Sequence, residues 1–450
     1  MTPAARIAAV IELLGQIEAL QRPADTVVQE YTRARRFMGS KDRRAVMDRV
    51  FAALRARARL NWWVARAGGE SRDEAERRAE TAAAGPRHLV LAALVLIDGM
   101  APEDVAGLCD GGQYHPGSLE PDERALVDAL AGQPLTHAEQ PLWVRVEVPA
   151  WLIPSFERVF GDHLERELAA LNQEAPVDLR VNPLIEPSRE AVTAALAEHG
   201  MDAAPTPYAP NGVRLAGRRA VTNSAPFRDG QVEVQDEASQ IAAALVGAAP
   251  DMAVCDICAG AGGKTLALAG DMDDRGRLVA LDIDAERLGR AGPRLARAGA
   301  HTVERRVLAD ERDPWLDANA EAFDRVLVDA PCSGVGAWRR QPDARWKLTQ
   351  KALANHTDLQ DLILDQAAPL VRPGGRLVYA TCSLLPEENG DRVAAFRERH
   401  PGFVPLPVEH VWAETIGGAC PGSGPDLTLT PARTGTDGFY IAVLERREAA

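Results

Sequence analysis

The first part of the chain, residues 1–138, has the hydrophobic spacing of helices. Apolar side chains recur three and four residues apart, as in Ile7, Val10, Ile11 and Leu14, and almost no segment alternates apolar and polar positions. A segment rich in glycine and turn-forming residues, CDGGQYHPGS at 109–118, interrupts the pattern. The spacing therefore predicts an all-α N-terminal domain.

The next region, residues 139–230, mixes short strand and helix signals. VDLRVNP at 177–183 predicts a strand, and SREAVTAALAEHG at 188–200 predicts a helix that Gly200 closes. PTPYAPNG at 205–212 predicts a loop. We expect a small α/β region here.

From residue 231 to 450, short apolar runs alternate with helical segments. Five runs predict strands: 252–258, 277–283, 302–308, 323–330 and 376–382. Alternation of this kind is typical of an α/β fold, in which helices cover both faces of a parallel sheet. Ligands of such sheets bind outside the carboxyl ends of the strands, so we expect binding and catalytic residues at those ends.

Length and composition limit the possibilities further. A chain of 450 residues, 46% of them hydrophobic, predicts two or three globular domains. Six cysteines at irregular spacing do not suggest a disulfide framework. The longest apolar stretch, Leu89 to Ile97, falls far short of the roughly 20 residues that span a bilayer, and the start does not resemble a signal peptide. We expect a soluble, cytoplasmic protein without a membrane partner.

The net charge of −14 argues against nonspecific coating of nucleic acid, but one segment is strongly basic. Residues 31–66 hold eleven basic side chains and only two acidic ones. The basic ones are Arg33, Arg35, Arg36, Lys41, Arg43, Arg44, Arg49, Arg55, Arg57, Arg59 and Arg66. The segment is interpreted either as a solvated helix face or as a surface for RNA phosphates.

A glycine-rich loop, DICAGAGGKT at 256–265, follows the first predicted strand. A phosphate-binding P-loop would need glycine at Cys258, and a dinucleotide loop would need a glycine three residues after Gly262. Asp282, at the end of the next strand, can accept ribose hydroxyls. The combination suits S-adenosylmethionine, which carries ribose and adenine without phosphate. A zinc or redox role for Cys255 and Cys258 lacks partner ligands in the sequence, so no metal is expected.

Two cysteines lie at further predicted strand ends. Cys332 follows DAP, and Cys382 stands in TCS. C5 of cytosine is a poor nucleophile, but a thiolate that adds to C6 makes C5 enamine-like, so that C5 can take a methyl group. Asp329, three residues before Cys332, can assist at N3 of the base. A neighbouring cation such as Lys264 would favour the thiolate. These arguments do not decide which thiol is the nucleophile.

The motifs resemble those of the Sun-type RNA (cytosine-5) methyltransferases, close to their RsmB branch. The quoted segments are DICAGAGGKT, VLVDAPCSGVGAWRRQPDARW, LVYATCSLLPEEN and DGFYIAVLER, and the resemblance covers most of 145–450. It implies that Cys382 is the nucleophile and that Cys332 helps to release the product. DNA cytosine methyltransferases use the Pro-Cys thiol instead, but their Glu-Asn-Val motif is missing because Gly390 follows Glu388 and Asn389.

The same resemblance assigns the cofactor contacts. Asp282 is expected at the ribose, Asp310 near the adenine, and Asp329 on the side of the methyl group and the base. The loop itself is expected to contribute Cys258, Ala259, Gly260, Ala261, Gly262, Gly263 and Lys264. Family members usually have Ala-Pro where this chain has Gly260-Ala261, so we expect a less rigid loop and weaker cofactor binding.

The resemblance also implies partners and accessory domains. Residues 1–138 are expected to form a NusB-like RNA-binding domain, 139–230 an RNA-recognition-like region, and 231–450 the Rossmann-like methyltransferase domain. The segment from Trp338 to Lys347 is interpreted as meeting the substrate strand, or else as capping the sheet. The expected substrate is small-subunit ribosomal RNA. The alternatives are transfer RNA or a noncatalytic assembly role, and a monomer is the default.

Overall fold

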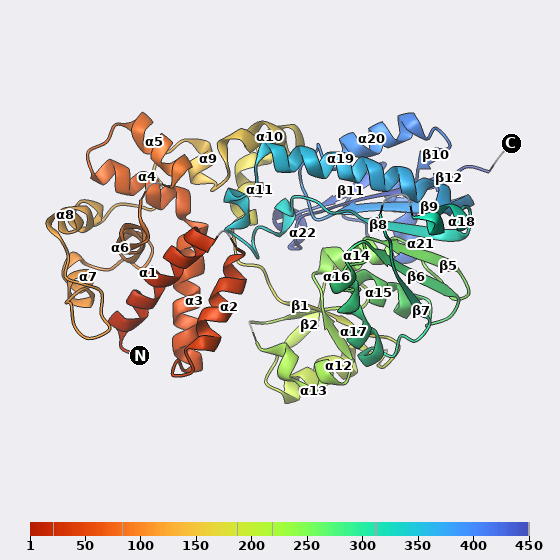
Figure 1. The fold of residues 1–450 in the computed structure, drawn as a ribbon, viewed down its shortest axis with the longest axis horizontal. Helices are drawn as coiled ribbons and strands as arrows, with labels where there is room; N and C mark the ends of the chain where they lie inside the picture. The colour runs from red at the N-terminus through yellow and green to blue at the C-terminus, as the bar shows by residue number, and fades with distance from the viewer. Residues whose placement is uncertain (21, 83, 187, 218, 311–312, 449–450) are drawn as a thin grey trace. The chain divides into compact units, whose positions relative to one another are not determined.

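The computed structural model divides into two compact units (Figure 1). It describes residues 1–20, 22–82, 84–186, 188–217, 219–310 and 313–448. The helical unit comprises Met1–Gln173 and the separate segment Trp338–Leu348. The sheet unit comprises Glu174–Ala337 and Thr349–Ala450.

The helical unit is all-α over residues 1–173, as the spacing of apolar residues predicted. Ile7, Val10 and Leu14 are buried along one face of the first helix, and Trp62 is buried in the same core. The helices are α1 (Pro3–Leu20), α2 (Ala24–Ala34), α3 (Ser40–Arg55), α4 (Arg57–Ala67), α5 (Arg72–Thr81), α6 (Pro86–Leu96), α7 (Pro102–Leu108), α8 (Pro121–Leu130), α9 (Leu142–Arg145), η1 (Ala150–Leu152), α10 (Ile153–Phe160), η2 (Gly161–His163) and α11 (Leu164–Leu171). They continue well past residue 138, because α10 and α11 bury apolar faces of their own.

The segment Trp338–Leu348, with the short helix η5 (Ala344–Trp346), belongs to the helical unit. Trp338 is fully buried and its ring lies edge-on to Phe156, with 6.2 Å between the centroids. Arg345 Nη1 donates to the carbonyl of Glu147 at 2.9 Å. Burial of Trp338, Arg339 and Arg345 contradicts the interpretation of these side chains as a substrate-facing or sheet-capping surface. Tryptophan and arginine side chains occur together on RNA-binding surfaces. They also occur in protein interiors in which backbone carbonyl groups accept hydrogen bonds from the arginine. The sequence alone does not distinguish these two environments.

The sheet unit begins with a small antiparallel sheet in the order β2-β3-β1-β4. The predicted strand at 177–183 is β1, and the predicted helix at 188–200 is α12. The elements are β1 (Asp178–Val181), α12 (Arg189–Glu198), β2 (Ala203–Pro205), β3 (Gly212–Leu215), η3 (Val221–Asn223), α13 (Ala225–Arg228) and β4 (Val232–Val234). Leu179, Val192 and Val213 form part of its buried core.

The main sheet has the order β10-β12-β9-β8-β5-β6-β7, with β11 paired to β12. Its strands are β5 (Ala253–Ile257), β6 (Arg277–Asp282), β7 (Val303–Val307), β8 (Phe323–Asp329), β9 (Val371–Thr381), β10 (Phe403–Pro405), β11 (Asp426–Leu429) and β12 (Phe439–Arg446). The five predicted strands are the parallel part, β7-β6-β5-β8-β9. The three further strands pair antiparallel and were not predicted.

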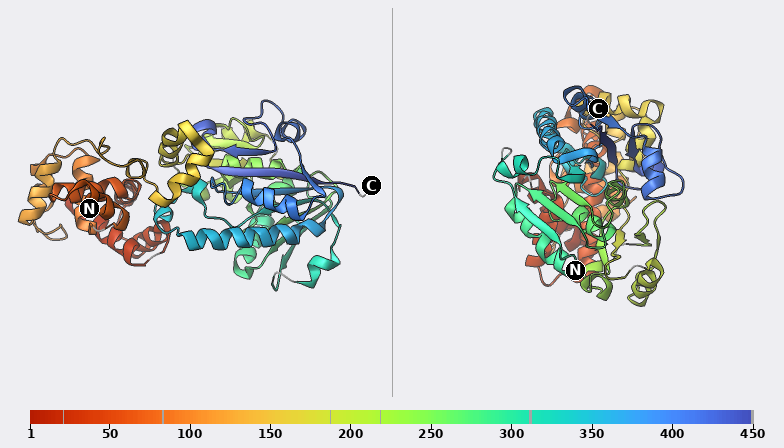
Figure 2. Two further views of the ribbon diagram at one scale, coloured as in Figure 1. Left: turned by 90° about the horizontal axis from the view of Figure 1, so that it is seen from above. Right: turned by 90° about the vertical axis from the view of Figure 1, so that its right-hand side faces the viewer.

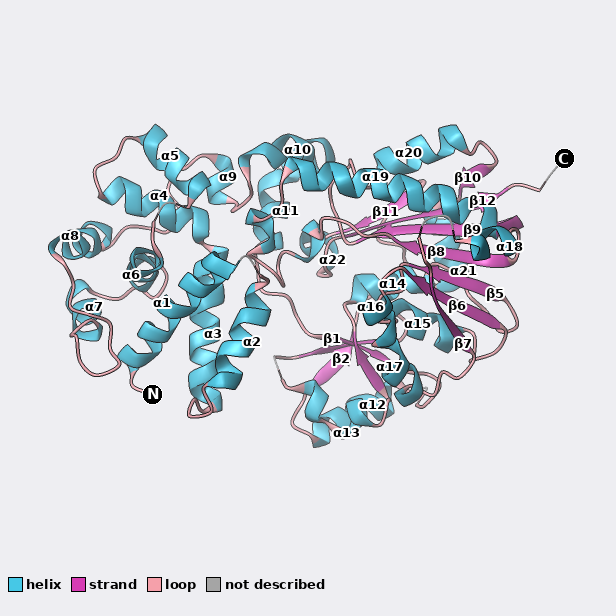
Figure 3. Ribbon diagram, viewed as in Figure 1, coloured by secondary structure: helices cyan, strands magenta, loops and turns pink. Residues whose placement is uncertain are grey.

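Helices cover both faces of the main sheet, as alternation predicted (Figures 2 and 3). On one face, α14, α15, α17 and α21 bury residues in a shared core, and on the other face α18, α19 and α20 do so. The bounds of the helices are α14 (Glu237–Ala244), α15 (Gly263–Asp271), α16 (Ala285–Gly289), α17 (Ala291–Arg297), α18 (Pro314–Ala318), η4 (Val335–Ala337), α19 (Gln350–Ala367), η6 (Ala368–Leu370), α20 (Gly390–Arg399), α21 (Val408–Thr415) and α22 (Pro431–Thr434). Within the described residues, no helix has the length and apolar character needed to cross a bilayer.

Candidate active site

The glycine-rich loop turns sharply between β5 and α15. Cys258, Gly260 and Gly262 all have positive φ angles, of 65°, 55° and 78°. Gly262 caps α15, and a Cβ atom there would lie 2.9 Å from the Ala291 Cβ, so a side chain would not fit. The left-handed turns bring the backbone N–H groups of the loop to the carboxyl edge of the sheet.

Asp282 holds this loop from the end of the neighbouring strand β6. Its Oδ2 accepts the backbone N–H of Gly260 at 2.8 Å, and its Oδ1 accepts that of Asp284 at 2.8 Å. Asp310 lies exposed beyond the end of β7, the next strand outward. Because β5, β6 and β7 are parallel, the loop, Asp282 and Asp310 all lie at one edge of the sheet.

Lys264, in the first turn of α15, is paired with Asp329 at the end of β8. The Lys264 Nζ atom lies 2.6 Å from Asp329 Oδ2 and 4.9 Å from the centre of the Phe439 ring. Lys264 is buried, whereas the Asp329 side chain is 31% exposed. This cation thus contacts a carboxylate and an aromatic ring, whereas the sequence had suggested a position beside a thiol.

A buried carboxyl group lies at the end of β5, directly before the loop. Asp256 has no exposed surface, and burial raises its pKa to about 7, although a 2.6 Å hydrogen bond from Thr265 Oγ1 opposes the shift. Asp329 and Lys264 act on the same pKa with opposite signs. The loop therefore rests on an acid that is close to half-protonated at neutral pH.

The two cysteines at the ends of β8 and β9 are adjacent. Cys332 Sγ lies 3.4 Å from Cys382 Sγ, and both thiols are free. The hydrogen bond with Cys382 and burial both raise the pKa of Cys332 well above its ordinary value. A neutral Cys332 beside Cys382 means that the pair carries at most one thiolate near neutral pH.

Sequence reasoning missed the polar groups that support the thiols. Glu388 is fully buried and contacts Ser333 and Ser383, the residues that follow Cys332 and Cys382. Gln360, on α19, donates to Glu388 and to the carbonyl of Pro331. The sequence signal that could have indicated this role is the presence of Glu388 shortly after Cys382. In the sequence, Glu388 had served only to argue against DNA methyltransferases.

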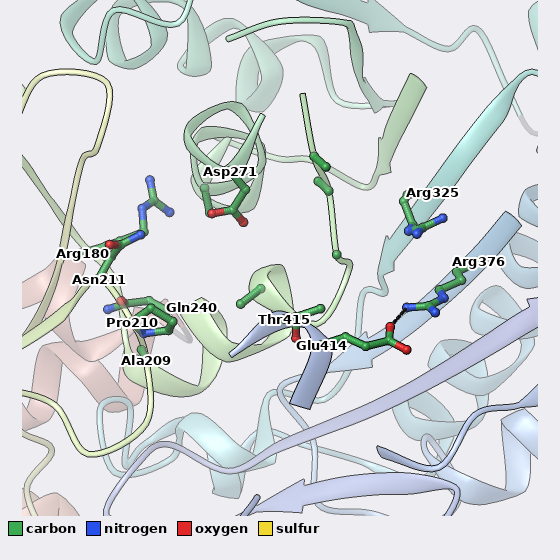
Figure 4. A pocket seen from close by; sticks show the side chains of 15 residues that line it. Arg180, Ala209, Pro210, Asn211, Gln240, Asp271, Arg325, Arg376, Glu414 and Thr415 are labelled. Atoms are coloured by element: carbon green, nitrogen blue, oxygen red, sulfur yellow. Dashed lines mark hydrogen bonds and ion pairs between the residues drawn. The ribbon is translucent and has the colours of Figure 1, made fainter. Parts of the chain in front are cut away.

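A separate cavity of about 420 Å³ lies elsewhere in the sheet unit (Figure 4). Arg180, Asp271, Arg325 and the ion pair of Arg376 with Glu414 line it. In the figure the Arg180 and Arg325 side chains lie on opposite sides of the view and do not converge on one point. Neither cysteine of the thiol pair lines this cavity. Over the described ranges, no group of three or more acidic, histidine or cysteine side chains is arranged to hold a metal ion.

Comparison with known proteins gave matches over most of the chain. A family model described as 16S rRNA methyltransferase RsmB/F matches residues 243–445, and a ferredoxin-like domain of RsmF/B-like methyltransferases matches residues 148–222. The probable ribosomal RNA small subunit methyltransferase B of Synechocystis sp. is 35% identical over 300 residues, which is 66% of each chain. The match thus spans slightly less than two thirds of that relative.

Two solved structures are similar in fold. The protein PH0851 aligns with a TM-score of 0.76 and 25% identity over 99% of both chains. A methyltransferase homolog protein from Pyrococcus horikoshii aligns with a TM-score of 0.57 and 26% identity, over 68% of this chain and 98% of the other. These similarities agree with the Rossmann-like sheet and with the helical N-terminal part.

Proposed function

Because the chain belongs to the RsmB/F family of 16S rRNA methyltransferases, we propose that it methylates C5 of a cytosine in small-subunit ribosomal RNA. Enzymes of this family use S-adenosylmethionine, the cofactor that the sequence predicted. The observation that carries the proposal is the pair of free thiols, 3.4 Å apart, at the ends of β8 and β9. β8 lies beside the loop-bearing strand β5, and β9 lies on the other side of β8. A thiol nucleophile separates this covalent chemistry from methyl transfer to a nitrogen or a hydroxyl group, which needs no thiol.

The residues at the sheet edge fit S-adenosylmethionine. The left-handed turns at Gly260 and Gly262 let the backbone approach its amino acid part, and the Asp282 carboxylate suits the ribose hydroxyls. The loop Cys258–Lys264, Asp310 at the adenine and Asp329 at the methyl side complete the proposed contacts. When bound, the cofactor supplies the methyl group that C5 takes up.

In the proposed reaction the Cys382 thiolate adds to C6 of the cytosine, the C5–C6 electron pair moves into the C4–C5 bond, and the C4–N3 electron pair moves onto N3. The carboxyl group of Asp329, which Lys264 contacts, is the proposed donor of the proton that N3 takes up as this charge develops. After C5 gains its substituent, a base removes the C5 proton and the Cys382 sulfur leaves, which restores the ring. The target base must be unstacked from the RNA to reach the thiol.

Two observations support the division of labour between the thiols. Cys332 has a raised pKa and therefore stays protonated at neutral pH. A protonated Cys332 can donate a hydrogen bond to the Cys382 sulfur, which lies 3.4 Å away. The Cys332 proton can likewise be donated to the Cys382 sulfur in the later step in which that sulfur leaves the base.

The test uses full-length protein, radiolabelled S-adenosylmethionine and bulk RNA or ribosomal subunits, with 5-methylcytosine mapped in the product. Wild type should label one RNA species, Cys382→Ala should label none, and Cys332→Ala should accumulate a covalent protein–RNA adduct. Labelling of transfer RNA alone would change the substrate. No labelling by wild type would favour a noncatalytic assembly role, and activity in Cys382→Ala would reverse the roles of the thiols.

The second part of the proposal is that the helical unit contacts RNA. Contacts within the helical unit reduce the number of cations in the basic segment 31–66 that are candidates for RNA binding. Arg55 donates to the carbonyl of Arg339, Arg59 pairs with buried Glu147, and Arg57 lies over the ring of Trp346. These three cations are therefore engaged in contacts within the helical unit, and we do not assign them to RNA binding.

The cations that remain exposed lie around the turn between α2 and α3. Arg33, Arg36, Lys41 and Arg44 are exposed there, and Phe37 between them is 72% exposed. An exposed aromatic ring flanked by cations suits an RNA strand, because the ring can stack on a base while the cations contact phosphates. We therefore assign the RNA contact to this α2–α3 surface and not to the whole basic segment.

A further inference from the structure

The loop between β9 and α20 carries a fully buried carboxylate, Glu388, among hydrogen-bond donors. Its Oε1 accepts the backbone N–H of Ser333 at 2.8 Å and the side-chain amide of Gln360 at 3.2 Å. Its Oε2 accepts the hydroxyl of Ser333 at 2.5 Å and the hydroxyl of Ser383. Each oxygen of the carboxylate is thus shared by two donors.

These donors lie next to the two thiols. Ser333 follows Cys332 at the end of β8, and Ser383 follows Cys382 at the end of β9. The serine hydroxyls also lie 3.3 Å from each other. Glu388 therefore connects two loops that lie 50 residues apart in the sequence, at the positions directly after the reacting sulfur atoms.

Other contacts hold the same two loops from either side. Gln360 Nε2 donates to the carbonyl of Pro331 at 2.9 Å, directly before Cys332. The backbone N–H of Gly336 donates to the carbonyl of Cys382 at 2.9 Å. The Tyr379 hydroxyl donates to the carbonyl of Glu388 at 2.6 Å, which fixes the backbone that carries the carboxylate. Glu388 is thus positioned by its own strand and in turn positions both loops.

A carboxylate is the group that this arrangement requires. An ionised carboxylate only accepts, so it can take hydrogen bonds from two hydroxyls, one backbone N–H and one amide. A glutamine of the same shape would present an NH₂ group to two of those donors, and at least one of them would lose its partner. The Glu388 charge also contributes to the raised pKa of Cys332, after the larger effects of Cys382 and burial.

We propose that Glu388 is a positioning residue that sets the separation and orientation of Cys332 and Cys382 for formation and release of the covalent adduct. The assignment rests on the proposed function, because it gives that reaction its thiol geometry. The side-chain hydrogen bonds of Glu388 described above go to Ser333, Ser383 and Gln360, which lie outside the glycine-rich loop, so its substitution should affect the thiol chemistry and leave cofactor binding intact.

The first experiment compares Glu388→Gln with wild type in the full-length chain. We expect kcat to fall at least roughly tenfold, while KM for RNA and the affinity for S-adenosylmethionine stay within about twofold. Glu398→Gln makes the same chemical change at an exposed position on α20 and should match wild type. An unchanged kcat in Glu388→Gln would refute the proposal, and so would a loss of kcat that is matched by weaker cofactor binding and a lower melting temperature.

A second experiment reads the thiol geometry without catalysis. Diamide removes two electrons and two protons from a pair of close thiols and leaves a disulfide, so its rate reports how well Cys332 and Cys382 are aligned. We expect wild type to form the Cys332–Cys382 disulfide faster than Glu388→Gln, as scored by mass spectrometry of peptides. Equal rates would overturn the proposal. The rate of disulfide formation can be measured without RNA, even if wild type methylates no RNA. Failure of the positioning proposal can therefore be distinguished from failure of the proposed function.

Serine variants cover the case in which Glu388→Gln fails to fold. Ser333→Ala and Ser383→Ala each remove one hydroxyl from the carboxylate and leave Glu388 in place. Each should slow both methylation and disulfide formation, and the effects should not add to those of Glu388→Gln if all act through one network. Fully additive effects, or no effect of either serine, would contradict a shared positioning role.

Discussion

At the scale of single residues, the pairing of Lys264 with Asp329 determines what each group can do. The 2.6 Å contact joins the cofactor loop to the end of β8, one residue before the Ala330–Pro331–Cys332 segment. Asp329 is partly exposed, so its carboxylate is available to a substrate while the ammonium group of Lys264 holds it in place. Lys264, a proposed cofactor contact, therefore also holds the carboxylate that is proposed to act at N3.

Replacement of Lys264 by methionine should lower kcat by roughly 10-fold to 100-fold, since a hydrogen bond to a charged group contributes about 1.5–3 kcal/mol. The apolar stem would keep its packing, and the carboxylate would lose its partner. Single-turnover methylation measures the rate, and calorimetry measures cofactor affinity. Lys264→Arg should restore part of the rate because it restores the charge. A variant with wild-type kcat would show that Asp329 needs no partner.

Asp256 predicts a dependence of stability on pH. Its pKa is raised by burial, from the ordinary carboxyl range to about 7 in the folded chain. The folded state therefore binds more protons than the unfolded state between about pH 4 and pH 7, and the Asp256 contribution to stability is lost as pH rises through that range. Asp256→Asn removes the ionisation and keeps an acceptor for Thr265.

Urea unfolding at pH 5, 6, 7 and 8 should therefore show wild type losing more stability than Asp256→Asn as pH rises. Asp271, whose pKa burial also raises to about 7, is present in both proteins and cancels in the comparison. Parallel curves for the two proteins would mean that Asp256 ionises normally.

Single residues differed in how far the sequence could place them. Cys332, Cys382 and Asp282 were predictable because each directly follows or closes an apolar run, and parallel strands bring such ends to one edge. The role of Glu388 was not predictable, because its partner Ser333 lies 55 residues away and serine followed by glycine carries no distinctive signal.

At the scale of elements, the segment Trp338–Leu348 shows how composition misleads. Its Trp and Arg side chains suggested a surface, whereas Arg345 is 1% exposed and donates to Glu147 and Asn172. Burial lowers the pKa of Arg345 to about 10, so the guanidinium stays charged and must keep its acceptors at neutral pH. The segment is a structural part of the helical unit.

Arg345→Ala should therefore destabilise the protein by about 2–4 kcal/mol, because it leaves buried acceptors unpaired and opens a space beside Trp338. The melting temperature of the full chain measures the effect. Lys351→Ala, at an exposed position of α19, should leave it unchanged. A stable Arg345→Ala protein with reduced RNA affinity would support the original surface interpretation.

Strands also differed in predictability. Four of the parallel strands, β5, β6, β8 and β9, each contain a run of Val, Leu, Ile or Ala between helical segments, whereas the edge strand β7 has charged residues between its two valines. β10 and β11 are only three and four residues long, which is too short for a periodic signal. β12 pairs antiparallel with β9 and follows only the four-residue helix α22, which gives no helical pattern in the sequence. The parallel half of the sheet was therefore predictable, and its antiparallel edge was not.

At the scale of the whole molecule, a net charge of −14 gives a net electrostatic repulsion between the protein and RNA. Affinity must then depend on a small number of local cations, and the α2–α3 surface is the group of exposed ones that we assign to RNA. Loss of a few charges there should have a larger effect than it would in a basic protein.

The double variant Arg33→Ala and Arg36→Ala should weaken RNA binding and flatten the salt dependence of the affinity by about 0.7 per lost phosphate contact. Cofactor affinity should not change. Arg72→Ala with Arg77→Ala removes two exposed arginines from α5 of the same unit and serves as the control. Equal losses in both double variants would indicate general electrostatics and no specific RNA surface.

The path of the backbone has a consequence for how this protein can be divided. The chain leaves the sheet unit after Ala337, contributes Trp338–Leu348 to the helical unit, and returns for α19. A fragment begun at residue 174 would keep Trp338 and Arg345 but lose Phe156 and Glu147, and its indole and guanidinium would meet water. The helical unit alone would lack part of its own interior. Loss or exchange of the helical unit by recombination should therefore yield aggregation-prone protein unless the eleven-residue segment is redesigned with it.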